Sequence, residues 1–425
     1  MSKYPSYEQM KDSGIEWLGE IPEHWEINKL IRKFNIVNGG TPKSSNKNYW
    51  NGEIVWITPA DLSELDSPHI TSSNRTITKQ GEANSSATLV PENSLVISKR
   101  APIGYVAISK VELCTNQGCY SLVEKKQESV INKYVYYYID SIKNYLKELG
   151  QGSTFMELSS SDLGEVDFLY PPLKEQKAIA DFLNREIGRI DELIEKKEKL
   201  IKLLEEKRQA TISQAVTKGL DSDVEMKDSG IEWLGEIPEY WGKIPLKYIA
   251  SNDENSFVDG PFGSNLKSEE YQDDGIPLIQ LNNIANGEHI IRNTKFISEE
   301  KAEELSRHNI ESGDIVIAKM ADPVARAAEV SKEYSKYVIV ADCIKLDPDT
   351  NICNIQYLVY TINSPYVRYQ AEAVASGSTR LRINLGKMKN IFVYLPPLEE
   401  QKEIADYLDQ ETNRIDNLID KTKEQ

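Results

Sequence analysis

The sequence predicts an α+β protein in which two mainly β domains are joined by long helices that form an antiparallel coiled coil, with an internal pseudo-two-fold repeat. Three observations support this. The segment MKDSGIEWLGEIPEHW at 10–25 recurs at 226–241 with one change, His24 against Tyr240. PPLKEQKAIADFL from Pro171 recurs as PPLEEQKEIADYL from Pro396. The stretches between them hold short β-like runs separated by turn residues. The period is far longer than the 20–50 residues of a solenoid unit, so it indicates a duplicated domain.

The two divergent middle stretches are predicted to be sheet-rich, each with one helix near its end. Helices are expected at 132–149 and 355–374, and their tyrosines at 134–138 and 357–360 fit core packing better than a row of DNA-stacking rings. Cys119 and Cys343, which fall at equivalent positions of the repeat, are likewise expected to be buried in the core. The predicted strands are 53–58, 93–98, 104–109 and 118–124 in the first copy and 276–281, 314–319, 336–342 and 391–395 in the second.

A long helix is predicted to follow Pro171 and Pro172, because residues 174–215 contain no proline and only one glycine. Its apolar residues are spaced alternately by four and three, which is the repeat of a coiled-coil seam. About 42 helical residues would make a rod of roughly 60 Å. The chain ends at Gln425, before any counterpart of residues 201–220, and we expect this short arm to weaken the helix pair. The predicted pairing residues are Leu183, Ile187, Ile190, Ile194, Ile201 and Leu204 in the first helix and Leu408, Ile415 and Ile419 in the second.

The composition limits the class of protein and the cellular compartment to be expected. The chain has 425 residues, a net charge of −17 and four cysteines without a CxxC pair. It has neither an 18-residue apolar run nor a signal-like start, so we expect a cytoplasmic protein without a membrane span. The acidic charge argues weakly against a nucleic-acid partner, but residues 28–170 carry about as many basic as acidic side chains.

No catalytic or metal motif is recognisable. Phosphate-loop, zinc-helix, nucleophile-elbow and dinucleotide-binding patterns are missing, and the four histidines do not cluster in sequence. The proline pairs before the two helices are interpreted as strand-to-helix breakers. The sequence therefore favours a binding protein over an enzyme.

Polar loops at matching places in the two copies are the candidate DNA-binding residues. Asn and Gln can read adenine and Arg or Lys guanine in the major groove, while hydroxyl groups can hold phosphates. Each residue alone is more often part of a solvated turn, and it is the recurrence in both copies that favours recognition. The candidates are Thr41, Lys43, Ser44, Asn46, Lys47, Thr58, Lys99, Arg100, Ser153 and Thr154 in the first copy and Ser264, Asn265, Lys267, Gln280, Asn282, Asn283, Lys319, Arg326, Ser378, Thr379, Arg380 and Arg382 in the second.

With the repeated G-E-I-P-E-x-W (19–25, 235–241) and P-P-L-x-E-Q-K-x-I-A-D-(F/Y)-L (171–183, 396–408), the whole chain resembles the specificity subunit of type I restriction-modification systems. The resemblance implies target recognition domains at 1–170 and 226–395, and conserved helical regions at 171–225 and 396–425. Each domain would read one half of a split DNA sequence. The subunit would have no catalysis and no cofactor of its own.

The resemblance also implies partners. Two modification subunits would use S-adenosylmethionine to methylate adenine in double-stranded DNA, and restriction subunits driven by ATP and Mg²⁺ would complete the assembly. Independently of the family, two unlike domains on one spacer predict a bipartite, asymmetric target whose reading centres lie about one helical turn, ~34 Å, apart. The alternatives are a coiled-coil scaffold that binds proteins and never DNA, and, least favoured, a stand-alone enzyme.

Overall fold

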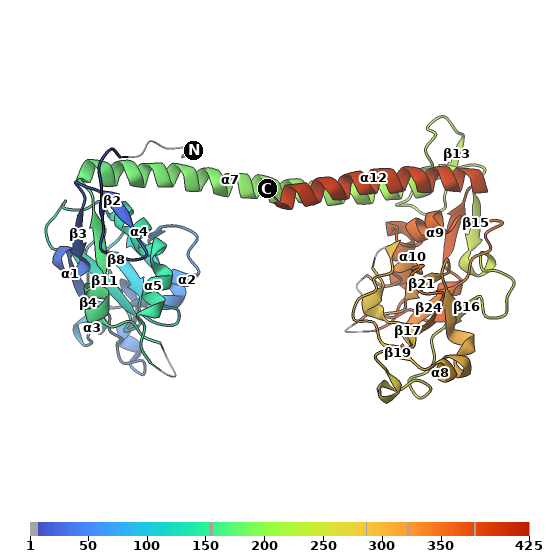
Figure 1. Ribbon diagram of the computed structural model, residues 1–425, viewed down its shortest axis with the longest axis horizontal. Helices are drawn as coiled ribbons and strands as arrows, with labels where there is room; N and C mark the ends of the chain where they lie inside the picture. Colours follow the sequence, from blue (N-terminus) through green and yellow to red (C-terminus); the bar gives the residue numbers. More distant parts are fainter. Residues whose placement is uncertain (1–6, 153–155, 286, 321–322, 378–379, 425) are drawn as a thin grey trace. The chain divides into compact units, whose positions relative to one another are not determined.

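The structure is a computed structural model that describes residues 7–152, 156–285, 287–320, 323–377 and 380–424. It divides into two compact units, Met1–Leu193 and Ile194–Gln425, each drawn in Figure 1 as sheets with short helices packed against them. The predicted α+β class is confirmed.

The first unit is built on a five-stranded sheet of order β4-β11-β8-β9-β6. Strand β11 pairs antiparallel with both β4 and β8, and β6 runs parallel to β9. A smaller sheet has the order β10-β5-β7. The bounds are β4 Phe34–Asn38, β5 Trp50–Ile57, β6 His69–Ile70, β7 Thr76–Ile77, β8 Leu95–Ser98, β9 Val106–Ser109, β10 Leu113–Thr115 and β11 Cys119–Glu124.

The second unit repeats this topology strand for strand. Its five-stranded sheet has the order β16-β24-β21-β22-β18, and β19-β17-β23-β20 corresponds to the smaller sheet with one added strand. The internal repeat is therefore a repeat of architecture as well as of sequence. The bounds are β16 Phe257–Asp259, β17 Ile276–Ile279, β18 Gly287–Glu288, β19 Phe296–Ile297, β20 Asn309–Glu311, β21 Ile315–Ala318, β22 Ala327–Glu329, β23 Lys336–Ile339 and β24 Cys343–Leu346.

All eight predicted strands are found, but each predicted helix of the middle stretches is broken in two. In the second unit Pro365 lacks a backbone NH and starts a new helix at its first turn, so the chain makes α9 (Ile355–Ile362) and α10 (Pro365–Val374). In the first unit α4 (Asn132–Ser141) and α5 (Lys143–Glu148) meet at Ile142, whose ψ of 14° leaves the helical region. Other helices are short: α1 Leu30–Lys33, α2 Pro59–Ser63, α3 Lys79–Ala83, α6 Ser160–Gly164, α8 Glu299–Glu304 and α11 Leu385–Lys389.

Three of the predicted core tyrosines of these helices are buried, whereas Tyr136, Tyr137 and Tyr360 are half-buried. Tyr134, Tyr138 and Tyr357 are at most 7% exposed. Their hydroxyl groups donate to backbone carbonyls of the last strand of each unit: Tyr134 to Leu169 and Tyr357 to Tyr394. A buried tyrosine needs such a partner, and here the partner ties the helix to the strand. Cys119 and Cys343 are also fully buried, in β11 and β24, and burial raises the pKa of the Cys343 thiol to about 12.

The repeated sequence elements form the frame of each unit. Strands β1 (Met10–Asp12) and β2 (Glu20–Pro22) make a hairpin, and β3 (Glu26–Lys29) pairs with β12 (Asp167–Tyr170). In the second unit β13 (Met226–Asp228) pairs with β14 (Glu236–Pro238), and β15 (Gly242–Pro245) with β25 (Phe392–Leu395). The hairpins have the same register in the two units, so the repeat of sequence is also a repeat of strand pairing.

The Glu-Gln pair of the proline motif anchors the start of each long helix. The Glu175 carboxylate accepts hydrogen bonds from the Trp25 indole (2.9 Å) and the His24 ring (2.8 Å), and Glu400 accepts from the Trp241 indole. The next residue, Gln401, is fully buried: its Oε1 accepts from the Asn354 NH at the start of α9. Gln176 bonds to the NH before α4 in the same way. The motif thus fastens three segments of each unit together.

The two long helices are α7 (Leu173–Lys218) and α12 (Leu398–Glu424). They run antiparallel, because Arg208 pairs with Asp416 at 3.0 Å while Gly219 lies beside Glu400. Leu408, Ile415 and Ile419 are at most 7% exposed, and Leu408 joins the unit's core with Ile212 and Val216 of α7. The predicted antiparallel coiled coil is confirmed, and Figure 1 shows α12 alongside the later part of α7.

The predicted seam of α7 is only partly used. Ile201 and Leu204 are half-buried, but Ile187, Ile190 and Ile194 are 40–55% exposed, and Leu183 is half-buried in the first unit. The expectation that this whole stripe pairs with α12 is therefore wrong for the described residues. The reason lies in the register: with Asp416 opposite Arg208, the end of α12 reaches only the region of Ile201.

Candidate nucleic-acid interface

Each unit places one lysine of the predicted loops at the same structural position. Lys99 follows β8 and Lys319 follows β21. The Lys99 NH donates to the Gly118 carbonyl and the Lys319 NH to the Asp342 carbonyl, both at 2.8 Å. Each lysine carbonyl then accepts at 2.9 Å from a backbone NH just before a short helix, Leu158 before α6 and Ile383 before α11. The backbone of the candidate site is thus the same in the two units, and only its side chains differ.

A glycine is required beside this position in both units. A Cβ atom on Gly39 would lie 1.9 Å from the Asn116 carbonyl oxygen, and one on Gly260 would lie 1.9 Å from the Val340 carbonyl oxygen. Such distances exclude any side chain. The chain leaving the first strand of the sheet therefore packs directly on the turn before β11 or β24, and brings its polar residues to that turn.

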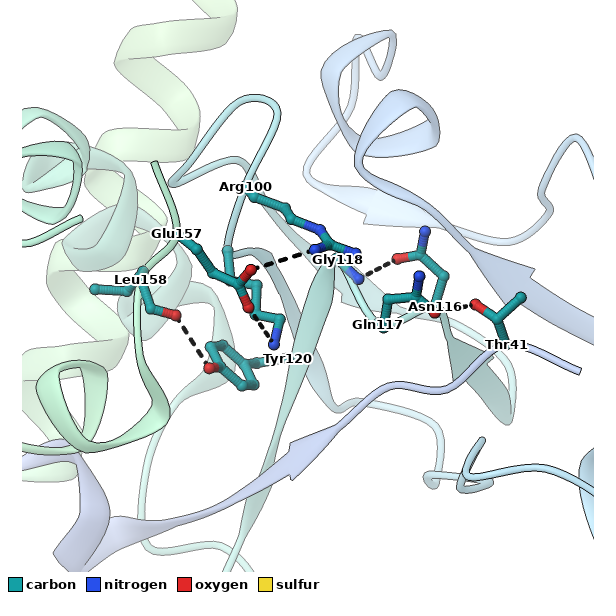
Figure 2. A network of polar contacts seen from close by, with 9 residues as sticks. Thr41, Arg100, Asn116, Gln117, Gly118, Tyr120, Glu157 and Leu158 are labelled. Carbon is teal, nitrogen blue, oxygen red and sulfur yellow. Dashed lines mark hydrogen bonds and ion pairs between the residues drawn. The ribbon is translucent and has the colours of Figure 1, made fainter. Parts of the chain in front are cut away.

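In the first unit the lysine belongs to a network centred on Glu157 (Figure 2). The Lys99 ammonium lies 2.8 Å from Glu157 Oε1, and Arg100 Nη1 lies 3.2 Å from Oε2. Hydrogen bonding from Lys99 and the two positive charges lower the pKa of the Glu157 carboxyl, against the opposing effect of its partial burial. Lys99 also lies over the Tyr120 ring, 4.8 Å from its centre. The two cations are held in place, and the Arg100 side chain remains 35% exposed.

The same network continues to a pair of uncharged residues. The Thr41 hydroxyl donates to Gln117 Oε1 at 2.6 Å, and Asn116 Oδ1 accepts from the Gly118 NH at 2.8 Å (Figure 2). Gln117 is exposed, and this bond leaves its amide NH₂ available. Sequence reasoning missed Gln117; the Asn-Gln-Gly turn before the strand was the signal that could have found it.

In the second unit the charges are arranged differently. Lys319 is buried and lies 3.1 Å from Asp259 at the end of β16, while it also donates to the Ala341 carbonyl. Arg382 occupies the place of Glu157, since Gln151 bridges to Glu157 as Ser376 bridges to Arg382. The Arg382 side chain is 50% exposed and lies 2.8 Å from Asp342. At this position the carboxylate of the first unit is therefore replaced by a guanidinium in the second unit.

Several of the predicted residues form hydrogen bonds within their own loops. Asn46 accepts from the Asn48 NH, and Thr58 forms the cap of α2 with Asp61. Asn283 is buried: its Oδ1 accepts from the Gln280 NH and its Nδ2 donates to two carbonyls. These bonds shape the loops, and direct DNA contact by these residues stays a prediction.

The other predicted residues are spread over the two loop clusters. Arg326 is half-buried, and its Nε has no hydrogen-bond partner among the described residues. Arg75, which sequence reasoning missed, stacks on Trp50 at 3.7 Å, next to the first loop. Ser153, Thr154, Ser378 and Thr379 lie outside the described residues. Lys43, Ser44, Lys47, Ser264, Asn265, Lys267, Asn282 and Arg380 are exposed, while Gln280 is half-buried.

The described part of the chain also bears on metal binding and on membrane spanning. It contains no group of three or more His, Cys, Asp or Glu side chains able to hold a metal ion. Among the same residues, no helix has the length and apolar character needed to cross a membrane.

Comparison with known proteins identifies the family. The family model described as "Type I restriction modification DNA specificity domain" matches residues 22–203 and again 263–425. The chain belongs to this family. The two matches cover most of the chain, and one falls largely in each of its two copies.

Relatives of this family resemble the chain over nearly its whole length. A specificity subunit of the type I restriction enzyme MjaIX from Methanocaldococcus jannaschii is 28% identical and aligns over 93% of this chain and 88% of its own. The EcoBI specificity subunit of Escherichia coli is 25% identical over 96% and 84%.

Solved structures share the fold. A chain from a study of type I restriction-modification complex assembly superposes with a TM-score of 0.69, at 18% identity over 95% of this chain and 94% of that one. The HsdS subunit from Thermoanaerobacter tengcongensis gives 0.59, at 18% identity over 94% and 91%. The family match and the similar specificity subunits confirm the predicted resemblance to type I specificity subunits, and the solved structures confirm the fold.

Proposed function

We propose that this chain is the non-catalytic DNA specificity subunit of a type I restriction-modification system, and that each of its units reads one half of a bipartite, asymmetric target. The family supports the general role, and the alternative of a scaffold that never binds DNA is not favoured. The observation that supports unlike half-sites is the exchange of Glu157 for Arg382 at one position of a shared backbone frame.

The side chains suggest different chemistry for the two halves. In the first unit Gln117 and Arg100 lie with Thr41 and Glu157, which together offer amide, guanidinium, hydroxyl and carboxylate groups. A glutamine amide suits adenine, and a carboxylate can accept from the amino group of cytosine. In the second unit the exposed Arg382 suits the two acceptors of guanine. Two half-sites of different sequence follow from this difference.

The acidic neighbours have a second role in this proposal. Glu157 and Asp342 hold Arg100 and Arg382 in one geometry while the site is empty of DNA. A guanidinium that is already ordered loses less side-chain entropy when it meets a base. The same carboxylates repel DNA phosphates. DNA of the wrong sequence, which offers no base contact, would therefore not be bound through electrostatic attraction alone.

Partners follow from the same proposal. The chain would recruit modification subunits that carry S-adenosylmethionine and, in the full assembly, restriction subunits that use ATP and Mg²⁺. The chain itself would bind none of these cofactors. Two copies of the modification subunit are proposed, one for each unit of the repeat.

Selection from a random duplex library tests this function. The chain is co-purified with the modification subunit of its own system, and bound duplexes are sequenced. The proposal expects enrichment of two short, different sequences separated by a fixed gap. Enrichment of a single continuous or palindromic sequence would overturn the two-unit reading, and no enrichment would favour the scaffold.

A further inference from the structure

The equivalent lysines of the two candidate sites are neutralised from different places in the chain. Lys99 pairs with Glu157, which lies before α6, whereas Lys319 pairs with Asp259 at the end of β16. The two lysine side chains are only 12% and 8% exposed. An ammonium group so far removed from water needs an opposite charge beside it, and removing that charge is costly. A carboxylate near the lysine is therefore required in both units, but its place in the chain is not fixed.

The strand position that carries Asp259 in the second unit carries Asn38 in the first. Asn38 ends β4 and lies opposite Tyr120, while Asp259 ends β16 and lies opposite Ile344. The next residue is a glycine in both units, and its NH donates to the first residue of the paired strand. The two side chains therefore leave equivalent points of the backbone. An amide at this point cannot neutralise a lysine, whereas a carboxylate can.

The position that carries Glu157 in the first unit shows the opposite exchange. Its equivalent in the second unit is Arg382, whose side chain is 50% exposed. The first unit thus combines an amide on the strand with a carboxylate at 157, and the second combines a carboxylate on the strand with a guanidinium at 382. A guanidinium beside an unpaired ammonium would be repelled by it. Position 382 can therefore carry a cation because the strand already supplies the carboxylate.

We propose that Asp259 determines the specificity of the second unit by acting through Lys319: it neutralises the lysine from the strand and so frees position 382 for the guanidinium that reads a base. In this role Asp259 is a positioning residue and needs no contact with DNA. Asn38 and Glu157 are the same two positions in the alternative arrangement. The base contact rests on the proposed function, but the coupling between the two positions does not.

A double-mutant cycle in the full chain tests the coupling, with the melting temperature as the readout. Asp259→Asn should lower the melting temperature by about 5 °C, because Lys319 loses its carboxylate. Arg382→Glu supplies a carboxylate at the position that Glu157 occupies in the first unit, so the double variant should recover most of this loss. Asp273→Asn, the same exchange at an exposed position of the second unit, is the matched control and should show no coupling to Arg382→Glu.

A reciprocal cycle in the first unit keeps the coupling testable if a variant of the second unit fails to fold. Glu157→Gln should lower the melting temperature because Lys99 loses its carboxylate. Asn38→Asp should restore it by supplying a carboxylate from the strand. Asn35→Asp, the same exchange at an exposed position of the same strand, is the control and should restore nothing.

DNA binding by the assembled complex, measured well below the melting temperature, separates positioning from mere stabilisation. Asp259→Asn should reduce discrimination at the half-site of the second unit at least about 5-fold, because Arg382 is then displaced by the unpaired lysine. The half-site of the first unit should be read as in the wild type. Asp259→Glu, which keeps the charge, should keep most of the discrimination.

The outcomes separate this proposal from the proposed function. The coupling is overturned if Asp259→Asn leaves the melting temperature unchanged, or if its effect and that of Arg382→Glu simply add. The specificity role is overturned if the Asp259→Asn complex still discriminates the second half-site as the wild type does. A wild-type complex that discriminates no sequence would defeat the proposed function and the specificity role together, while the two melting cycles would still decide the coupling.

Discussion

Replacing Arg382 by alanine should damage the reading of one half-site and leave the other intact. The side chain is 50% exposed and its ion pair with Asp342 is at the surface, so its loss should cost the fold at most about 1 kcal/mol. A bidentate contact to guanine contributes about 1–3 kcal/mol of discrimination. That energy corresponds to roughly 5- to 150-fold in affinity. The effect on recognition should therefore exceed the effect on stability.

The assay compares three duplexes in a binding titration with the assembled complex: the full target, and the target with either half-site scrambled. For Arg382→Ala, scrambling the half read by the second unit should weaken binding about 5- to 150-fold less than it does in the wild type, while scrambling the other half should weaken binding as in the wild type. Arg414→Ala on α12, where Arg414 is paired with Glu411, is the matched control and should discriminate normally. Equal loss on all three duplexes would refute base reading and mark a phosphate contact instead.

Three further predictions concern stability, each measured by urea unfolding. Gln401→Ala should lower the free energy of unfolding by about 2–4 kcal/mol, because it removes three hydrogen bonds made by a fully buried side chain. Lys402→Ala should change it little, and similar values for the two variants would contradict the anchoring role of Gln401. Leu408→Ala should lower the free energy of unfolding by about 2–5 kcal/mol, and Leu418→Ala, at an exposed position, by under about 1 kcal/mol. A small effect of Leu408→Ala would argue against the packing of α12 on α7. Burial lowers the pKa of His289 to about 4, so stability should fall by up to about 3 kcal/mol as pH drops from 6.5 toward 4; His289→Gln should flatten this dependence.

The sign of the pH effect follows from proton binding. Between pH 6.5 and 4 the unfolded chain takes up a proton on this histidine while the folded chain does not. Burial disfavours the charged form of the folded ring and so lowers its pKa, and the Nδ1 of the neutral ring accepts from the Ser331 NH at 3.1 Å. Full stability from this residue is therefore present above pH 6.5. A stability that is level from pH 7 to 4.5 in the wild type would contradict the assignment.

Much of the fold was predictable because the same order of strand-like and helix-like segments occurs twice in the sequence. Both sets of strands and the antiparallel helix pair follow from period and repetition. The helix break at Pro365 was also visible in the sequence, but the apolar spacing on both sides was read as one helix. The exposed Ile187 and Ile190 were not predictable, because the sequence does not fix where α12 lies along α7.

The candidate site was less accessible to sequence reasoning. Loop position identified Lys99 and Lys319 correctly as equivalents, but their counterions come from segments distant in sequence: Glu157 in one unit and Asp259 in the other. A polar residue such as Asn283 looks the same in the sequence whether its side chain faces DNA or holds a loop together. Only three-dimensional pairing separates these two uses, and it also brought Gln117 to light beside Thr41.

Methylome sequencing of the host tests the central claim most directly. The genome is sequenced for methyladenine with the chain intact, with its gene deleted, and with Arg382→Ala in its place. The account predicts a split, asymmetric methylated motif that disappears on deletion and becomes degenerate in one half only in the variant. An unchanged methylome after deletion, or a motif relaxed equally in both halves by the variant, would contradict it.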